Sequence, residues 1–228
     1  MPTAVVTGAN SGIGNALTQI LVNEGYKVIG ADITIGDPIK NLSCEAIQLD
    51  VSSPPSIKAF ADQVGDQPID LLLNVAGVMA PPHQDTLGQV DFETLEKTFR
   101  VNTFGPLLLT QALLPNITKA AHPRVAVMSS RMGSIADNSS GSQYSYRSSK
   151  AAVNAIFKSL AVDLKEKGIA VILLHPGIVK TNLLGGEEEV KVAVEPDIAA
   201  SDLYRVLMSK GLESTGRWWH RSGEELPW

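Results

Sequence analysis

The sequence contains little cysteine, no long apolar run and no excess of positive charge, and each absence excludes a class of protein. Cys44 is the single cysteine of 228 residues, so neither an intrachain disulfide nor a cysteine-rich metal site can form. No apolar run approaches the roughly 18 residues that a membrane helix requires, so no membrane span is predicted. The net charge of −5 argues against nucleic-acid binding, because a phosphate backbone attracts a basic surface.

A metal site, a secretory leader and a second domain also lack support in the sequence. The four histidines do not form a metal-ligand spacing, so no metal is predicted. The N-terminus has neither the basic start nor the apolar stretch of a signal peptide, and we therefore expect a cytoplasmic protein. Because a single domain commonly spans roughly 100–250 residues, we expect one domain over residues 1–228.

Short apolar runs rich in β-branched residues alternate with helical stretches along the chain. These runs are Ala4–Thr7, Lys27–Ala31, Ala46–Leu49, Ile69–Asn74, Arg124–Met128 and Ile169–Leu174. The alternation of strands and helices predicts parallel pairing, and the nearly continuous hydrophobicity predicts helices on both faces of the sheet. The predicted fold class is therefore α/β, a Rossmann-type doubly wound parallel sheet.

Helix signals mark three longer segments. The helix predicted over Gly12–Gly25 ends on a glycine, which can adopt the left-handed conformation that closes a helix. An N-capping aspartate opens the stretch Asp91–Pro115, which is predicted to bend at Gly105-Pro106. A third helix is predicted over Tyr144–Lys167, with Gly168 as its stop.

A glycine-rich run, Thr7-Gly8-Ala9-Asn10-Ser11-Gly12-Ile13-Gly14, joins the first predicted strand to the first predicted helix. Glycine permits the tight turn, lets a pyrophosphate approach bare backbone and allows the helix to pack against the sheet. The unpaired amides of the helix N-terminus then favour the phosphate charge. Its position between strand and helix predicts a dinucleotide site, whereas the motif alone is also compatible with a simple tight turn.

Asp32 follows Gly14 by 18 residues and ends the second predicted strand. A carboxylate there can accept hydrogen bonds from the adenosine ribose hydroxyls, and it repels the additional phosphate of NADP. Neighbouring Ser11, Ile33 and Thr34 offer no cation to neutralise that phosphate. We therefore predict NAD as the cofactor, with NADP less favoured. A strand-end aspartate that caps a turn is the alternative interpretation of Asp32.

Tyr146 and Lys150 lie four residues apart, one helical turn, so the phenol and the ammonium point the same way. A nearby cation favours the phenolate and is expected to lower the tyrosine pKa toward the range of a useful general acid. Most such pairs lie on a solvated helix face, so this pair indicates catalysis only in combination with the other motifs of the chain. Tyr144 has Ser148 four residues on and no cation, so we expect it to line the pocket instead.

Taken together, the motifs resemble the short-chain dehydrogenase/reductase family over essentially the whole chain. The glycine turn, Asp50-Val51, Asn74-Val75-Ala76-Gly77 and His175-Pro176-Gly177-Ile178-Val179-Lys180-Thr181 match its cofactor segments, with Val75 in place of a second asparagine. The run Tyr146–Asn154 and the ending Gly223–Trp228 resemble the smaller C-factor-type and sniffer-type members. The cofactor residues that the resemblance implies are Gly8, Asn10, Ser11, Gly12, Ile13, Gly14, Asp32, Asp50, Val51, Asn74, Ala76, Gly77, Tyr146, Lys150, Pro176, Gly177, Val179 and Thr181.

The same resemblance implies four catalytic residues, Asn102, Ser130, Tyr146 and Lys150. Tyr146 would exchange a proton with the substrate, Lys150 would lower its pKa and hold the nicotinamide ribose, and Ser130 would hydrogen-bond the substrate oxygen. Asn102 would orient a water that links Lys150 to solvent. Ser130 lies 16 residues before Tyr146, a longer separation than is usual, and Ser134, twelve residues before Tyr146, is the competing serine.

The expected function is NAD-dependent hydride transfer between nicotinamide and a small carbonyl or secondary alcohol substrate. The alternatives are an NADP-dependent carbonyl reductase and a non-catalytic regulator that senses NAD. A sugar epimerase of the extended branch is excluded, because the chain has no room for its substrate domain. The resemblance also implies a homodimer or homotetramer that associates through the two long central helices.

Substrate contacts are less strongly indicated. An apolar pocket is predicted from Met79, Met132, Tyr144 and Leu184, although packing explains each of them equally well. A short substrate loop is expected near residues 182–194, with Gly185-Gly186 as its hinge and the acidic run Glu187-Glu188-Glu189 exposed to solvent.

Overall fold

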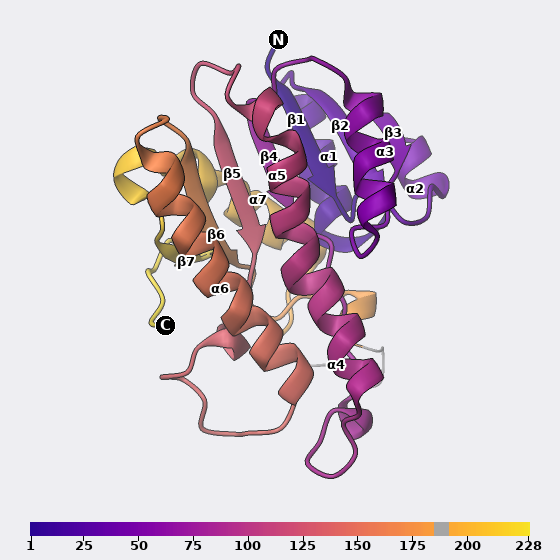
Figure 1. Ribbon diagram of the computed structural model, residues 1–228, viewed down its shortest axis with the longest axis vertical. Coiled ribbons are helices and arrows are strands. Elements are labelled where there is room, and N and C mark those ends of the chain that lie inside the picture. The colour runs from indigo at the N-terminus through magenta and orange to yellow at the C-terminus, as the bar shows by residue number, and fades with distance from the viewer. Residues whose placement is uncertain (185–191) are drawn as a thin grey trace.

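A computed structural model describes residues 1–184 and 192–228, and its described part is built on one parallel sheet (Figure 1). The strand order is β3-β2-β1-β4-β5-β6-β7, and every neighbouring pair is parallel. The strands are β1 (Thr3–Thr7), β2 (Lys27–Asp32), β3 (Glu45–Gln48), β4 (Leu71–Asn74), β5 (Arg124–Met128), β6 (Ala170–His175) and β7 (Trp218–His220). The predicted doubly wound sheet is confirmed.

Helices cover both faces of the sheet (Figure 1). One face packs against α1 (Gly12–Asn23), the short α2 (Asp37–Lys40) and α7 (Pro196–Met208), and the other against α3 (Pro54–Val64), α5 (Gly105–Ile117) and α6 (Tyr144–Lys165). Neighbouring residues of a strand face opposite layers, so Val5 and Val6 of β1 belong to different core clusters. Burial on both faces explains why the strands carry continuous apolar runs.

The predicted glycine stops are observed. Gly25 follows α1 with φ 81° and Gly168 follows α6 with φ 72°, both in the left-handed region. The predicted cap of α4 (Phe92–Phe99) is also present, because the side chain of Asp91 accepts a hydrogen bond of 2.8 Å from the amide of Thr94. No helix among the described residues is both long and apolar enough to span a bilayer.

The helical stretch predicted over residues 91–115 differs from the prediction. It consists of α4, a π-helical turn over Arg100–Phe104 and then α5, so the irregular turn lies just before Gly105-Pro106. Gly105 packs so closely that a Cβ there would stand 2.6 Å from the carbonyl oxygen of Val51. Close packing against Val51 and an irregular helical turn therefore occur next to each other at this point.

The sequence patterns did not predict four further elements, α2, α3, α7 and β7. The strand β7 is three residues long and pairs Trp218 and Trp219 with Leu173 and Leu174 of β6, which is too short for a periodicity to show. The expected hinge at Gly185-Gly186 and the acidic run at residues 187–189 lie outside the described residues.

Candidate active site

A cleft of about 790 Å³ opens at the carboxyl ends of the strands. The strand order reverses on either side of β1 and β4, and such a switch point is where α/β sheets of this type bind ligands. The described lining residues that were predicted for the cofactor are Gly8, Ser11, Gly12, Ile13, Gly14, Asp32, Asp50, Val51, Ala76, Gly77, Tyr146, Lys150, Pro176, Gly177, Val179 and Thr181. The structure therefore brings most of the predicted residues together.

The glycine turn brings bare backbone to the cleft. A Cβ on Gly14 would stand 2.1 Å from the carbonyl oxygen of Gly8, and one on Gly8 would stand 3.1 Å from the backbone of Ala76. The hydroxyl of Thr7 accepts hydrogen bonds from the amides of Val75 and Ala76, at 2.9 and 3.0 Å, and so joins β1 to the segment after β4. A turn that excludes side chains and leads into a helix N-terminus fits the phosphates of a dinucleotide.

Asp32 is fixed at the end of β2 by two backbone amides. Its carboxylate accepts hydrogen bonds from the amide of Asn10, at 3.0 Å, and from that of Thr34, at 3.1 Å. Each carboxylate oxygen keeps a further acceptor site for a ribose hydroxyl. The described residues that line this end of the cleft, Ala31, Asp32, Ile33, Leu49, Asp50 and Val51, include no lysine or arginine.

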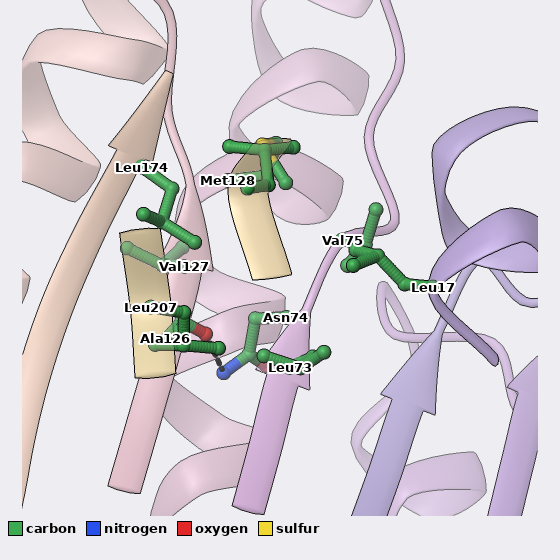
Figure 2. Close-up of a pocket in the computed structure, with 10 residues that line it drawn as sticks. Leu17, Leu73, Asn74, Val75, Ala126, Val127, Met128, Leu174 and Leu207 are labelled. Atoms are coloured by element: carbon green, nitrogen blue, oxygen red, sulfur yellow. Dashed lines mark hydrogen bonds between the residues drawn. The ribbon is translucent and has the colours of Figure 1, made fainter. Parts of the chain in front are cut away.

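Two predicted cofactor residues do not line the cleft in the described structure. The side chain of Asn10 accepts hydrogen bonds from the amides of Gly36 and Ile39, at 3.1 and 3.4 Å, so it braces the start of α2. Asn74 lines a small apolar cavity against α1 and α7. Its side-chain amide donates a hydrogen bond of 3.3 Å to the carbonyl of Ala126 (Figure 2). Both side chains hold backbone in place instead of facing a ligand.

Asn102 is also absent from the described lining of the cleft. It lies in the π-helical turn, where its amide oxygen accepts from the amide of Val78 and its amide nitrogen donates to the carbonyl of Val78, both at 2.8 Å. The same nitrogen donates to the hydroxyl of Ser149 at 3.1 Å. Asn102 therefore clamps the backbone next to Gly77 onto the helix that carries Tyr146.

Ser130 and Tyr146 face each other across the cleft. Ser130 follows the end of β5 and Tyr146 lies in the first turn of α6, and the hydroxyl of Ser130 lies near enough to the phenol to lower its pKa. Ser134 differs, because its hydroxyl accepts from the amide of Asp137 at 3.1 Å and it does not belong to the described cleft lining. Of the two serines, Ser130 is the one that lines the cleft next to Tyr146.

Burial dominates the ionisation of the Tyr146–Lys150 pair. Burial raises the pKa of Tyr146 to about 12, and the neighbouring hydroxyl of Ser130 opposes that rise. The pKa of Tyr146 is therefore raised in the described structure, and the expectation of a lowered pKa is wrong. The ammonium of Lys150 donates a hydrogen bond of 2.9 Å to the carbonyl of Met128, and its nitrogen lies 5.7 Å from the centre of the Tyr146 ring. Burial also lowers the pKa of Lys150 to about 8.

The segment after β6 closes the far side of the cleft. His175, which was not among the predicted site residues, lines it, and burial lowers its pKa to about 3, so the ring is neutral at pH 7. Gly177 follows with φ 75°, and Thr181 comes so near the glycine turn that a Cβ on Gly12 would lie 3.1 Å from its methyl group. The signal for His175 was its place at a predicted strand end.

The substrate end combines apolar and charged side chains. Met79 and Met132 line it as predicted, together with Ile178 and Leu183. Tyr144 does not belong to the described lining and is 41% exposed, so its predicted place in the pocket is wrong, and the side chain of Leu184 lies outside the described part.

Two arginines next to the facing pair also line this end and were not predicted. Arg131 pairs with Asp137 at 2.6 Å, and Arg147 donates to the carbonyl of Met132 at 3.3 Å, so both guanidinium groups hold the loop that follows Ser130. The carbonyl of Trp228 accepts a hydrogen bond of 3.1 Å from the amide of Ala136 in the same loop.

Known proteins share this sequence and architecture. A family model described as short chain dehydrogenase matches residues 2–191. The C-signal protein of Myxococcus xanthus is 41% identical over 172 residues, which make up 75% of this chain and 100% of that protein. Similarity to this protein and to the Sniffer structure below confirms the predicted resemblance to C-factor-type and sniffer-type members.

Solved structures are similar over the whole chain. An NADPH-bound carbonyl reductase from chicken fatty liver has a TM-score of 0.91 and 31% identity, covering 100% of this chain and 99% of that one. The carbonyl reductase Sniffer of D. melanogaster has a TM-score of 0.90 and 27% identity, covering 100% of both chains.

The buried ammonium of Lys150 makes a testable contribution to stability. Its folded-state pKa of about 8 lies below its ordinary value of 10.5, so between these pH values the unfolded chain binds more protons and stability rises with pH. Below about pH 8 the full cost of burying the charge is present. In urea unfolding, Lys150→Met is expected to remove up to roughly 3 kcal/mol of the increase in unfolding free energy between these two pH values. The exposed Lys58→Met is the control and should keep the wild-type slope; an unchanged slope in Lys150→Met contradicts the assignment.

Proposed function

The chain belongs to the short-chain dehydrogenase family, an oxidoreductase family that acts on carbonyl or alcohol groups with a nicotinamide cofactor, and on that premise we propose an NAD-dependent enzyme with Tyr146 as its proton donor and acceptor. The observation that carries this proposal is that Tyr146 and Ser130 line the cleft next to the buried Lys150, with the Ser130 hydroxyl near enough to the phenol to lower its pKa. These groups lie at one end of a cleft whose other end presents Asp32.

The cleft fits a dinucleotide along its length. The amides of the glycine turn would hold the pyrophosphate, Asp32 the adenosine ribose, and Asp50-Val51 the adenine. The segment Pro176–Thr181 and Lys150 would hold the nicotinamide end. When bound, the nicotinamide supplies or takes up the hydride, and the protein contributes orientation and proton transfer.

In the proposed reduction, Tyr146 donates its phenolic proton to the carbonyl oxygen of the substrate. With its pKa near 12 the phenol keeps that proton at neutral pH, which suits an acid that protonates a forming alkoxide. Ser130 donates a hydrogen bond to the same oxygen and stabilises the charge that develops there. The ammonium of Lys150 favours the phenolate once the proton has left. Oxidation of an alcohol uses the same groups in reverse.

The preference for NAD over NADP rests on charge at the adenosine end. Asp32 directs its carboxylate toward the position of the ribose hydroxyls, and its described neighbours in the cleft supply no cation for a phosphate. NADPH is the cofactor of the chicken carbonyl reductase, so an NADP-dependent carbonyl reductase is the second candidate.

We further propose a small substrate held against apolar side chains and a homodimer or homotetramer. Met79, Met132, Ile178 and Leu183 give the substrate end its apolar surface. Phe104 and Leu108, at the start of α5, and Val162 of α6 are exposed apolar residues on the two long helices through which such enzymes are expected to associate.

A screen of carbonyls and secondary alcohols, followed at the NADH absorbance band with both cofactors, tests the proposal. Tyr146→Phe is expected to lower kcat by roughly 10²–10⁴-fold, because it removes the transferable proton, while the Kd for NADH stays within about twofold. Tyr144→Phe is the matched control, since this exposed phenol lies two residues away and outside the cleft. Wild-type turnover in Tyr146→Phe would falsify the proposed role.

The choice between the serines is tested by paired substitutions. Ser130→Ala is expected to lower kcat by roughly 10²–10³-fold through loss of a hydrogen bond to the substrate oxygen. Ser134→Ala removes the acceptor for the Asp137 amide and should change thermal stability more than kcat. The reverse pattern in steady-state kinetics assigns the role to Ser134.

Cofactor preference follows from the charge of Asp32. Fluorescence titration is expected to show tighter binding of NADH than of NADPH, and Asp32→Asn should narrow the ratio by roughly tenfold, since it removes a repulsion of about 1.4 kcal/mol or more. The exposed Asp37→Asn, on the same side of the sheet, should leave the ratio unchanged. Tighter NADPH binding by the wild type contradicts the preference.

A further inference from the structure

The helix that carries Tyr146 and Lys150 has no cap of its own. Its N-cap residue is Gln143, whose side chain makes no capping hydrogen bond. Ser142 and Gln143 both have positive φ values, 56° and 55°, which residues other than glycine adopt at a cost in free energy. The backbone that leads into α6 is therefore strained, and the start of the helix must be held by another part of the chain.

Asp85 provides that hold from a loop about sixty residues earlier in the chain. Its carboxylate accepts hydrogen bonds from the amide of Ser145 at 2.8 Å, the hydroxyl of Ser145 at 2.7 Å and the amide of Tyr146 at 3.2 Å. Its backbone carbonyl accepts from the amide of Gln143 at 2.7 Å and from the hydroxyl of Ser142 at 3.4 Å. One residue thus satisfies five donors at the start of α6.

The contacts of Asp85 match what a helix N-terminus requires. The amides of Ser145 and Tyr146 are the second and third of α6, the two that an N-cap side chain ordinarily satisfies. A negative charge there is also stabilised by the helix dipole. Asp85 is fully buried, so water cannot replace it as the acceptor for these groups.

The contacts of Asp85 bear directly on Tyr146 and Ser130, the two side chains that face each other across the cleft. Tyr146 is bonded through its backbone to Asp85, and its side chain lies next to Ser130, which follows β5 on the other side of the cleft. The hydroxyl of Ser145 accepts a further hydrogen bond of 3.3 Å from Thr98, which ties the same turn to α4. The position of the phenol relative to Ser130 therefore depends on how the first turn of α6 is held.

We propose that Asp85 is a positioning residue for the reaction, which holds the first turn of α6 so that the phenol of Tyr146 lies within hydrogen-bond reach of Ser130. It caps α6 in place of the N-cap residue that the helix lacks. The proposal rests on the proposed function of Tyr146. It assigns to a buried aspartate outside the cleft lining a role in the rate of the chemical step.

Asp85→Asn and Asp85→Ala test the proposal. In either rotamer of the substituted asparagine side chain an amide group would face one of the backbone donors, so Asp85→Asn loses part of the clamp and Asp85→Ala loses all of it at the carboxylate. We expect kcat to fall by roughly 10²-fold in Asp85→Ala, the loss that a displacement of about 1 Å can cause, and less in Asp85→Asn. The Kd for NADH is expected to stay within about twofold in both variants, because the glycine turn and Asp32 lie on other elements.

The pH profile of alcohol oxidation gives a readout that loss of stability does not move. The neighbouring hydroxyl of Ser130 lowers the pKa of Tyr146, so a displaced phenol should shift the ascending limb of the profile to higher pH in both variants. Asp91→Ala is the matched control, since it removes the cap of α4 at 2.8 Å from Thr94. It should lower the thermal midpoint and leave kcat and the profile unchanged.

The outcomes separate this proposal from the proposed function. Wild-type kcat and pH profile in both folded Asp85 variants, together with loss of turnover in Tyr146→Phe, overturn the role of Asp85 alone. Turnover retained in Tyr146→Phe overturns the proposed function instead. If Asp85→Ala does not fold, Asp85→Asn with NADH titration and circular dichroism decides the question.

Discussion

The ammonium of Lys150, buried against the carbonyl of Met128, is the constraint on which the site depends. A charge in that position is stabilised by fixed dipoles instead of water, so the surrounding backbone must stay in place. Gly133 lies so close that a Cβ there would stand 2.7 Å from the backbone of Lys150, which leaves the turn after β5 no freedom to shift. The end of β5 and the first turns of α6 therefore form one rigid unit, and both members of the facing pair belong to it.

Local signals predicted the elements whose pattern is long enough to show, and tertiary contacts decided the rest. The buried strands and the glycine stops at Gly25 and Gly168 follow from chain periodicity and backbone freedom. The π-helical turn and β7 do not, because the first lies next to a close tertiary contact of Gly105 with Val51 and the second is three residues long. The local sequence of a helix does not show which backbone segment will pack against it in the folded protein.

The site was predictable by residue and less so by role. Ser130, Tyr146 and Lys150 come together as the motif spacing indicates, whereas Asn102 and Asn74 use their amides on backbone groups that no spacing reveals. The pKa of Tyr146 is raised, whereas the sequence predicts a lowered value. The sequence shows a cation nearby, but it does not show how deeply the phenol is buried. Asp85 escaped prediction for a similar reason, since its partners lie about sixty residues away.

The loop between Ser130 and α6 is anchored at each end, and its middle packs outward. Arg131 and Arg147 bind within the loop, and Ala136 is paired with the backbone of Trp228 beyond β7. Extra residues in this connection therefore lengthen the wall of the substrate end without moving the serine or the phenol. Positions of this loop that line the cleft, such as Met132 and Asp137, are where evolution or laboratory selection can change substrate preference while the chemistry is conserved.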